Sequence, residues 1–149
     1  MRINSFSDVS LRLLTVLASV PDDELPTTRE LAEAVGTPYN HVSKAVLKLR
    51  QMGLVEAIRG RSGGIRISAG GRNATVGQVL RILDERMDVA TCLTDMGECP
   101  LIDDCGLRGA LNHAREAFYA SLDNVTIHSL ARKPAGGPVA VTLSTVRPG

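Results

Sequence analysis

The sequence has few aromatic residues and lacks tryptophan: two phenylalanines and two tyrosines occur among 149 residues. No apolar run approaches the roughly twenty residues that a membrane-spanning helix needs, and the first thirty residues lack a signal-peptide pattern. Neither a nucleophile with a neighbouring base nor paired carboxylates that periodicity would bring together in a pocket are recognisable. These absences argue against an enzyme and a membrane protein, and they make the cytoplasm the expected compartment.

Cysteine is absent from most of the chain, and Cys92, Cys99 and Cys105 fall within fourteen residues. An odd number of thiols cannot all pair, and in a reducing compartment such a cluster favours a metal site over disulfides. Zinc knuckles take two thiolates from a Cys-x-x-Cys turn, which neither gap resembles. The wide gaps and the Cys99-Pro100 pair favour an iron-sulfur cluster. Structural zinc and plain thiols remain alternatives.

Three thiolates leave one coordination position for another ligand. His113 and His128 are candidates, although solvated histidines are the simpler interpretation. By its position alone, Asp8 is explained as a carboxylate at the positive end of a helix dipole.

The net charge of +1 hides an uneven distribution. Residues 26–66 carry seven lysines and arginines against three acids, whereas residues 84–105 carry seven acids against one arginine. We therefore expect a polyanion to bind the first half of the chain and not the cysteine segment.

Hydrophobic periodicity and capping residues predict a mostly α-helical protein with a small β wing. The predicted helices cover residues 7–20, 27–35, 37–52, 75–87 and 106–122, and the predicted strands cover 54–58 and 65–68. Thr27 and Thr37 are expected to cap the second and third helices, and Gly36 to end the second. The glycine-rich residues 69–71 are expected to be a break. Two short helices around a glycine turn, followed by a hairpin, are typical of a winged helix-turn-helix.

This pattern divides the chain into three parts. Residues 1–72 are the expected DNA-binding domain, with the helix-turn-helix at about 28–51 and the wing at about 54–68. Residues 73–130 are expected to hold the cluster-binding loop and dimerisation helices, and residues 131–149 a linker-like C-terminal tail. The long helix has apolar residues at three- and four-residue steps, which predict a dimer contact. These residues are Leu107, Leu111, Ala114, Phe118 and Leu122.

The candidates for DNA contact belong to the helix-turn-helix or to the loop of the hairpin. They are Thr28, Tyr39, Asn40, His41, Lys44, Lys48, Arg59, Arg61, Ser62 and Gly63. The polar and basic side chains of the third helix can donate to base edges and phosphates. Arg59 and Arg61 can enter a minor groove, and the glycines allow the backbone to approach phosphate. An ordinary solvated face is the alternative, which the basic loop makes less favourable.

Several motifs together resemble those of one protein family. They are Phe6-Ser7-Asp8-Val9 with Arg12, Thr28-Arg29-Glu30-Leu31-Ala32, Pro38-Tyr39-Asn40-His41, Gly53-Leu54-Val55, Arg59-Gly60-Arg61-Ser62-Gly63-Gly64, the three cysteines with Cys99-Pro100-Leu101, and Ala117-Phe118-Tyr119-Ala120. From residue 1 to about 130 the chain resembles the iron-sulfur winged-helix transcription regulators. Within that family it is most similar to the nitric-oxide-responsive repressors.

The resemblance implies a homodimer that binds a partly palindromic DNA operator and releases it when nitric oxide nitrosylates the cluster. It implies one 4Fe-4S cluster per subunit, held by Cys92, Cys99 and Cys105, with Asp8 of the opposite subunit as the fourth ligand. Arg12, one helical turn beyond Asp8, would support this site. The six-residue gap between Cys92 and Cys99 departs from the five that relatives often have, and it bears on the cluster type.

Two other functions remain open. A 2Fe-2S regulator of the same family would sense redox state or cluster supply. A zinc-stabilised DNA-binding protein would use the three cysteines and one acid structurally and would sense nothing.

Overall fold

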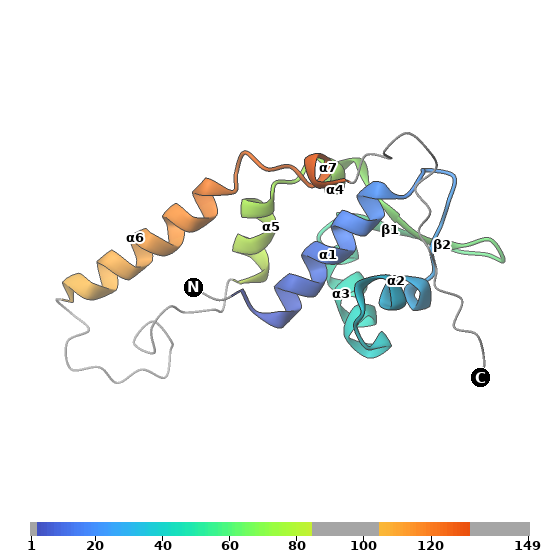
Figure 1. The fold of residues 1–149 in the computed structure, drawn as a ribbon, viewed down its shortest axis with the longest axis horizontal. Coiled ribbons are helices and arrows are strands. Elements are labelled where there is room, and N and C mark those ends of the chain that lie inside the picture. The colour runs from blue at the N-terminus through green and yellow to red at the C-terminus, as the bar shows by residue number, and fades with distance from the viewer. Residues whose placement is uncertain (1–2, 85–104, 132–149) are drawn as a thin grey trace.

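The computed structural model describes residues 3–84 and 105–131. Its elements, in chain order, are α1 (Ser5–Ser19), α2 (Thr28–Val35), α3 (Tyr39–Gln51), β1 (Val55–Ile58), β2 (Gly64–Ile67), α4 (Ala69–Asn73), α5 (Val76–Leu83), α6 (Gly106–Ser121) and α7 (Ile127–Leu130). The mostly helical fold with a small β wing is confirmed (Figure 1).

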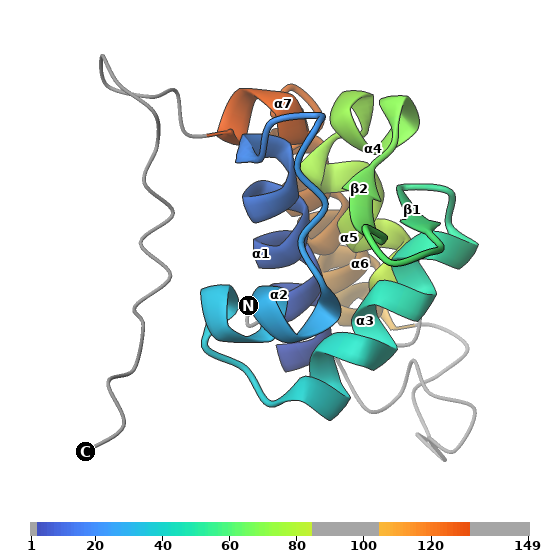
Figure 2. The same ribbon diagram turned by 90° about the vertical axis from the view of Figure 1, so that its right-hand side faces the viewer.

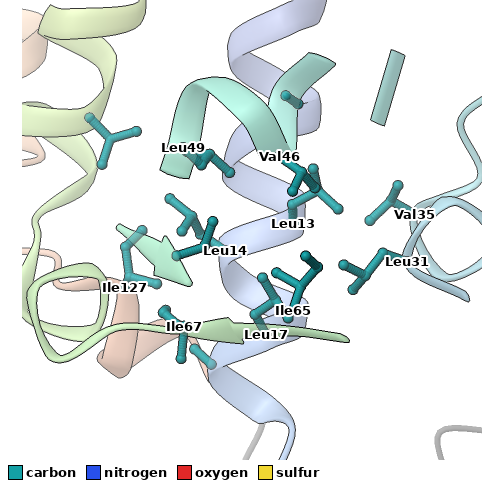
Figure 3. Close-up of a cluster of buried hydrophobic side chains, with 14 of the residues drawn as sticks. Leu13, Leu14, Leu17, Leu31, Val35, Val46, Leu49, Ile65, Ile67 and Ile127 are labelled. Atoms are coloured by element: carbon teal, nitrogen blue, oxygen red, sulfur yellow. The ribbon is translucent and has the colours of Figure 1, made fainter. Parts of the chain in front are cut away.

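Helix α1 lies at the centre of the hydrophobic core. Leu13 and Leu14 are fully buried, and Leu17 is nearly so. The helix contacts α2, α3, α5, α7 and β2. Figure 3 shows the side chains that surround it: Leu31 and Val35 from α2, Val46 and Leu49 from α3, Ile65 and Ile67 from β2, and Ile127 from α7. Because apolar burial is the main stabilising term in folding, α1 holds the helix-turn-helix and the wing in one body.

The helix-turn-helix forms as its capping residues predict. The Thr27 hydroxyl accepts from the backbone N–H of Glu30, and the Glu30 carboxylate accepts from the backbone N–H of Thr27. Gly36 ends α2 at a φ of 63°, in the left-handed region that glycine adopts without strain. The buried stripe of α3 is also confirmed, and it consists of Val42, Ala45, Val46 and Leu49.

The expectation that Thr37 caps the third helix is wrong. Pro38 occupies the cap position of α3, and no side chain completes the cap. The backbone N–H of Thr37 donates instead to the Ala32 carbonyl at 3.0 Å, and its hydroxyl donates to the Val35 carbonyl at 3.4 Å. Thr37 is therefore bound to the end of α2, and its side chain does not cap α3.

The wing is an antiparallel hairpin whose register pairs Val55 with Ile67 and Ile58 with Gly64. Val55, Ile65 and Ile67 face the core, whereas the connecting turn projects clear of the helices (Figure 1). One face of the hairpin therefore anchors it, and the turn remains outside.

The expectation that the glycine-rich residues 69–71 form a break between elements is wrong. These residues belong to the short helix α4. The Ser68 hydroxyl caps this helix by accepting from the backbone N–H of Gly71 at 2.9 Å. A Cβ atom on Gly71 would lie 2.1 Å from the Leu54 carbonyl oxygen. Glycine is required here by a close approach to the backbone and not by a bend.

Helices α5, α6 and α7 complete the described structure. α5 begins with the predicted capping box of Thr75 and Gln78. Helix α6 extends away from the body, with its C-terminal end beside α5 (Figure 1). Helix α7 is not predicted by the sequence, and it places Ile127 in the core with no exposure. None of the helices in residues 3–84 and 105–131 is long and apolar enough to cross a membrane.

Candidate DNA-reading surface and cluster-ligand residues

The polar face of α3 is open to solvent, opposite the stripe that packs on α1. Tyr39, Asn40, His41 and Lys44 are exposed, whereas Lys48 is half-buried. None of the ion pairs between described residues includes Lys44 or Lys48. The face therefore offers donors and cations to an acidic partner without first breaking an internal pair.

The aromatic ring at the start of α3 is supported by a cation from α2. The guanidinium of Arg29 lies 5.6 Å from the centre of the Tyr39 ring, a distance at which a cation and an aromatic face attract each other. Tyr39 is nevertheless 48% exposed, and the neighbouring Thr28 is half-buried. Arg29 is a residue that the sequence places in the basic half of the chain without indicating this role.

The turn of the wing carries the second group of candidates. Arg59, Arg61 and Ser62 are exposed, and Gly63 is half-buried. Gly60 has a φ of 117°, and the backbone N–H of Gly63 donates to its carbonyl at 3.1 Å. The glycines thus shape a tight turn that holds both arginines outside the core. Figure 2 shows this turn on the same side of the molecule as α3.

A hollow of about 200 Å³ separates the start of α1 from the start of α3. Phe6 and Val9 supply apolar walls, His41 and Lys44 supply polar and basic ones, and Ser5 completes the lining. The first turn of α1 and the start of α3 therefore border one surface.

Asp8 lies in this first turn and pairs with Arg12. The two side chains approach to 2.6 Å between an Arg12 nitrogen and an Asp8 oxygen, with a second contact at 3.2 Å. The Asp8 side chain remains 44% exposed. Its carboxylate is accessible from outside the subunit, and Arg12 is the cation that faces it within the subunit.

Of the three cysteines, Cys105 is described, and Cys92 and Cys99 lie outside the described residues. Cys105 is a free, half-buried thiol at the cap position of α6. Within residues 3–84 and 105–131, no three His, Cys, Asp or Glu side chains lie together in a way that could hold a metal ion. His113 and His128 are exposed on α6 and α7.

Helix α6 leaves part of its apolar stripe exposed. Leu107 is 67% exposed, Ala114 is exposed, and Leu111, Phe118 and Leu122 are half-buried. Tyr119 is the residue of α6 that reaches the core. Phe118 and Leu122 pack against the core, so the part of the stripe that is open to a partner is the N-terminal part, at Leu107 and Ala114.

A buried carboxylate that the sequence does not single out joins three elements. Asp84 accepts hydrogen bonds from the side chains of Asn4 and Ser7, both at 2.5 Å, and from the Tyr119 hydroxyl at 3.4 Å. Burial, together with the charge of Asp84, raises the pKa of the Tyr119 phenol, which keeps it a donor. The sequence signal at Asp84 is only its place at the end of an amphipathic helix.

Comparison with known proteins shows which family these features belong to. A family model described as "Rrf2: Iron-dependent Transcriptional regulator" matches residues 3–133. The chain is 46% identical over 145 residues to the HTH-type transcriptional repressor NsrR of Streptomyces coelicolor, and the match covers 97% of each chain.

Two solved structures share the fold. The global cysteine regulator CymR of B. subtilis matches 88% of this chain and 96% of its own, with a TM-score of 0.67 and 24% identity. IscR of T. potens matches 87% of this chain and 85% of its own, with a TM-score of 0.68 and 17% identity. The chain belongs to the Rrf2 family of iron-dependent transcriptional regulators.

Proposed function

We propose that this regulator is a homodimeric repressor that binds operator DNA, carries one iron-sulfur cluster per subunit and releases the DNA in response to nitric oxide. The observation that carries the proposal is the common exposure of the basic face of α3 and the basic turn of the wing. Both are anchored through α1, so they move as one body.

The DNA contacts are assigned by the chemistry of each group. Tyr39, Asn40, His41 and Lys44 approach the major groove, as the second helix of a helix-turn-helix does. Thr28 and Lys48 contact the backbone beside the groove. Arg59 and Arg61, with Ser62 and Gly63 in the same turn, contact phosphate or the adjacent minor groove. These residues lie in the half of the chain in which basic residues outnumber acids.

The exposed stripe of α6 is proposed as the dimer contact. A leucine that is 67% exposed, followed along the helix by half-buried apolar residues, favours a partner helix. A two-fold dimer would place two reading helices on successive half-sites of a partly palindromic operator.

The donor set fits an iron-sulfur cluster in its chemistry. Thiolates are the usual ligands of such clusters, and Cys105 is a free thiol. Cys92, Cys99 and Cys105 are proposed to hold a 4Fe-4S cluster together with Asp8 of the partner subunit. The exposed Asp8 carboxylate is accessible to a second subunit. When bound, such a cluster supplies iron atoms that nitric oxide binds.

Asp8 and Arg12 are proposed to respond to that signal. Asp8 is the one oxygen donor of the set, and carboxylate suits harder metal ions than thiolate does. Arg12, already paired with Asp8 within the subunit, is placed to receive the carboxylate when it is released. Loss of the bond between Asp8 and the cluster of the partner subunit would allow the two helix-turn-helix units to leave their half-sites on the operator.

The cluster and dimer are tested by anaerobic native mass spectrometry of the full-length protein. A dimer with two 4Fe-4S masses is expected. A 2Fe-2S mass would favour the cluster-supply regulator, and colourless protein that contains zinc would favour the structural alternative. Equal operator affinity before and after addition of nitric oxide would contradict the proposed signal.

The DNA surface is tested on duplexes selected by the protein from a random pool. Lys48→Ala is expected to weaken binding and to reduce the slope of log affinity against log salt by about one, because one phosphate contact is lost. The matched control is Arg66→Ala, since Arg66 is paired with Glu56 at 2.6 Å across the hairpin. If both variants bind like the wild type, α3 is not the reading helix.

A further inference from the structure

Helix α5 is bound to α6 through the side chain of Arg81. The guanidinium donates to the Glu116 carboxylate at 2.7 Å and to both carboxylate oxygens of Asp123, at 2.7 and 2.9 Å. It also lies 5.7 Å from the centre of the Tyr119 ring, within the range of a cation–π attraction. A two-pronged contact between arginine and a carboxylate fixes direction as well as distance. Arg81 therefore sets the angle at which α6 leaves α5.

The same end of α5 is bound to α1 through Asp84, three residues after Arg81. One carboxylate oxygen of Asp84 accepts from Asn4 Nδ2 and from Ser7 Oγ, both at 2.5 Å. Asn4 is itself the cap of α1, because its side-chain oxygen accepts from the backbone N–H of Ser7 at 2.7 Å. Asp84 is 5% exposed, and a buried carboxylate is unfavourable unless hydrogen bonds replace its hydration. Separation of α5 from the start of α1 is therefore unfavourable too.

Tyr119 connects these two sets of contacts. Its ring faces Arg81, and its hydroxyl donates to the second oxygen of Asp84 at 3.4 Å. Figure 1 shows α5 between α6 and α1, and α1 in turn packs against α3. We call the contacts that Arg81 and Asp84 make with α6 and α1 the α5 junction. The junction joins the proposed dimer helix to the helix that supports α3.

The far end of α6 magnifies any change of angle at the junction. Glu116 and Tyr119, which contact α5, lie toward the C-terminal end of α6, whereas Leu107 near the other end is 67% exposed. Leu107 and Tyr119 are twelve residues apart, which corresponds to about 18 Å along a helix. A small rotation at the junction therefore produces a larger displacement at Leu107, where the partner subunit is proposed to bind.

We propose that Arg81 and Asp84 are positioning residues that set the half-site spacing which the dimer accepts on DNA. The inference rests on the proposed function, in which α6 forms the dimer contact and α3 reads each half-site. Because the junction fixes α6 relative to α1 and α3, it fixes the separation of the two reading helices. One base pair added between the half-sites moves them by about 3.4 Å and rotates them by about 34°. A rigid dimer follows such a change only by straining itself or the DNA.

A purely structural role of the junction predicts a different result. Loss of a structural contact lowers the free energy of unfolding and changes the affinity for every duplex by the same factor. Loss of a positioning contact reduces the discrimination between duplexes that differ in spacing alone. The ratio of two affinities separates these roles, because the stability of the subunit cancels in it.

The experiment uses the palindromic duplex that the full-length wild type selects from a random pool. Base pairs are added or removed singly at its centre, and anaerobic fluorescence anisotropy measures the affinity for each spacing. Proteins of equal iron content are compared, so that cluster loading does not enter the ratio. We expect the wild type to bind the altered spacings at least about tenfold more weakly, because strain opposes the restored register.

Two variants loosen the junction from opposite sides. Arg81→Met removes the polar contacts with α6, and Asp84→Ala removes the acceptor that holds α1. Each should lower the spacing penalty to about threefold or less, because the loosened dimer adjusts with less strain. Asp84→Asn should keep the full penalty, since its amide oxygen accepts the same hydrogen bonds from Asn4 and Ser7.

Arg72→Met is the matched control for Arg81→Met. Arg72 donates to the Asp22 carboxylate at 2.6 Å and to the Ala18 carbonyl at 3.1 Å. It thus joins α4 to the opposite end of α1 by the same kind of contact, at a distance from the junction. This variant is expected to be less stable than the wild type and to keep the wild-type spacing penalty.

The outcomes separate this inference from the proposed function. Circular dichroism establishes which variants fold, and Arg81→Met suffices if Asp84→Ala does not. A folded junction variant with the wild-type penalty overturns the inference, as does loss of the penalty in Asp84→Asn or Arg72→Met. A wild-type dimer that binds all spacings alike also overturns it and leaves the proposed function standing. A wild type that binds the selected duplex as a monomer overturns the proposed function itself.

Discussion

Gly77 shows how one residue sets the contact between α5 and α6. A Cβ atom at this position would lie 2.2 Å from the Asp123 carboxylate and 2.4 Å from the Tyr119 carbonyl oxygen. The Asp123 side chain is held in place by two hydrogen bonds from Arg81, at 2.7 and 2.9 Å. These bonds lower the pKa of Asp123, so the pair persists well below neutral pH. Only glycine fits this site without displacing the pair.

Gly77→Ala is therefore expected to destabilise the protein by about 1–3 kcal/mol, the usual cost of overpacking. Chemical denaturation followed by circular dichroism measures the change. The control is Gly70→Ala, where the nearest atoms to an added Cβ lie at 3.6 Å. That variant should match the wild type or be slightly more stable. Equal stability of both variants would show that α5 and α6 are not held by this close contact.

At the scale of elements, local capping determines where most helices begin. The capping boxes of α2 and α5 form between residues three apart in the sequence, so the pattern alone predicts them. Thr37 has a similar local sequence signal but is held by the end of α2. The contact between Thr37 and the end of α2 thus overrides the tendency of Thr37 to cap α3. Thr27 has no such competing contact and caps α2.

These two threonines provide a matched test. Thr27→Ala is expected to lower the free energy of unfolding by about 0.5–2 kcal/mol, because the backbone N–H of Glu30 loses its cap. Thr37→Ala should cost less, since Thr37 makes no cap for α3. Denaturant titration of both variants gives the comparison. A larger loss for Thr37→Ala would mean that α3 begins at Thr37 after all.

The contribution of the Thr27 cap to the free energy of unfolding should depend on pH. Hydrogen bonds from the Thr27 backbone and hydroxyl lower the pKa of Glu30 below its usual value. A carboxyl whose pKa is lowered on folding contributes stability that is present above its unfolded pKa and is lost as the pH falls through its folded pKa. The stability difference between wild type and Thr27→Ala should therefore shrink in that acidic range.

At the scale of the whole molecule, residues from both ends of the described chain share one core. Ile127 from α7 has no exposure and packs with the residues of α1. The backbone adds two links, from the N–H of Ile127 to the Ala74 carbonyl at 2.9 Å and from the N–H of Val76 to the Val125 carbonyl at 2.8 Å. The helix-turn-helix with its wing and the helices that follow it are therefore joined by packing and by hydrogen bonds.

Ile127→Ala is expected to lower the stability of the whole protein by about 2–5 kcal/mol, because it leaves a cavity in the shared core. Helix content by circular dichroism and the fluorescence of buried Tyr119 should change in one transition. Leu130→Ala is the control, because Leu130 is 38% exposed. Two separate transitions in the wild type would show that the core is divided.

The sequence by itself determined the features that depend on neighbouring residues. Capping boxes, the glycine end of α2 and the apolar stripe of α3 involve residues within one or two helical turns, and all three are confirmed. The family motifs are also local strings. The roles of Cys92, Cys99 and Asp8 stay predictions, since two of these residues lie outside the described chain and the third needs a partner.

Only the tertiary structure decided the contacts between distant residues. The burial of Asp84 depends on Asn4 and Ser7, which are 80 and 77 residues away in the sequence. The place of Ile127 in the core and the requirement for glycine at position 77 likewise depend on elements that meet only in the fold. No periodicity or spacing encodes such pairs, because the sequence pattern reports which face of an element is buried and not what it is buried against.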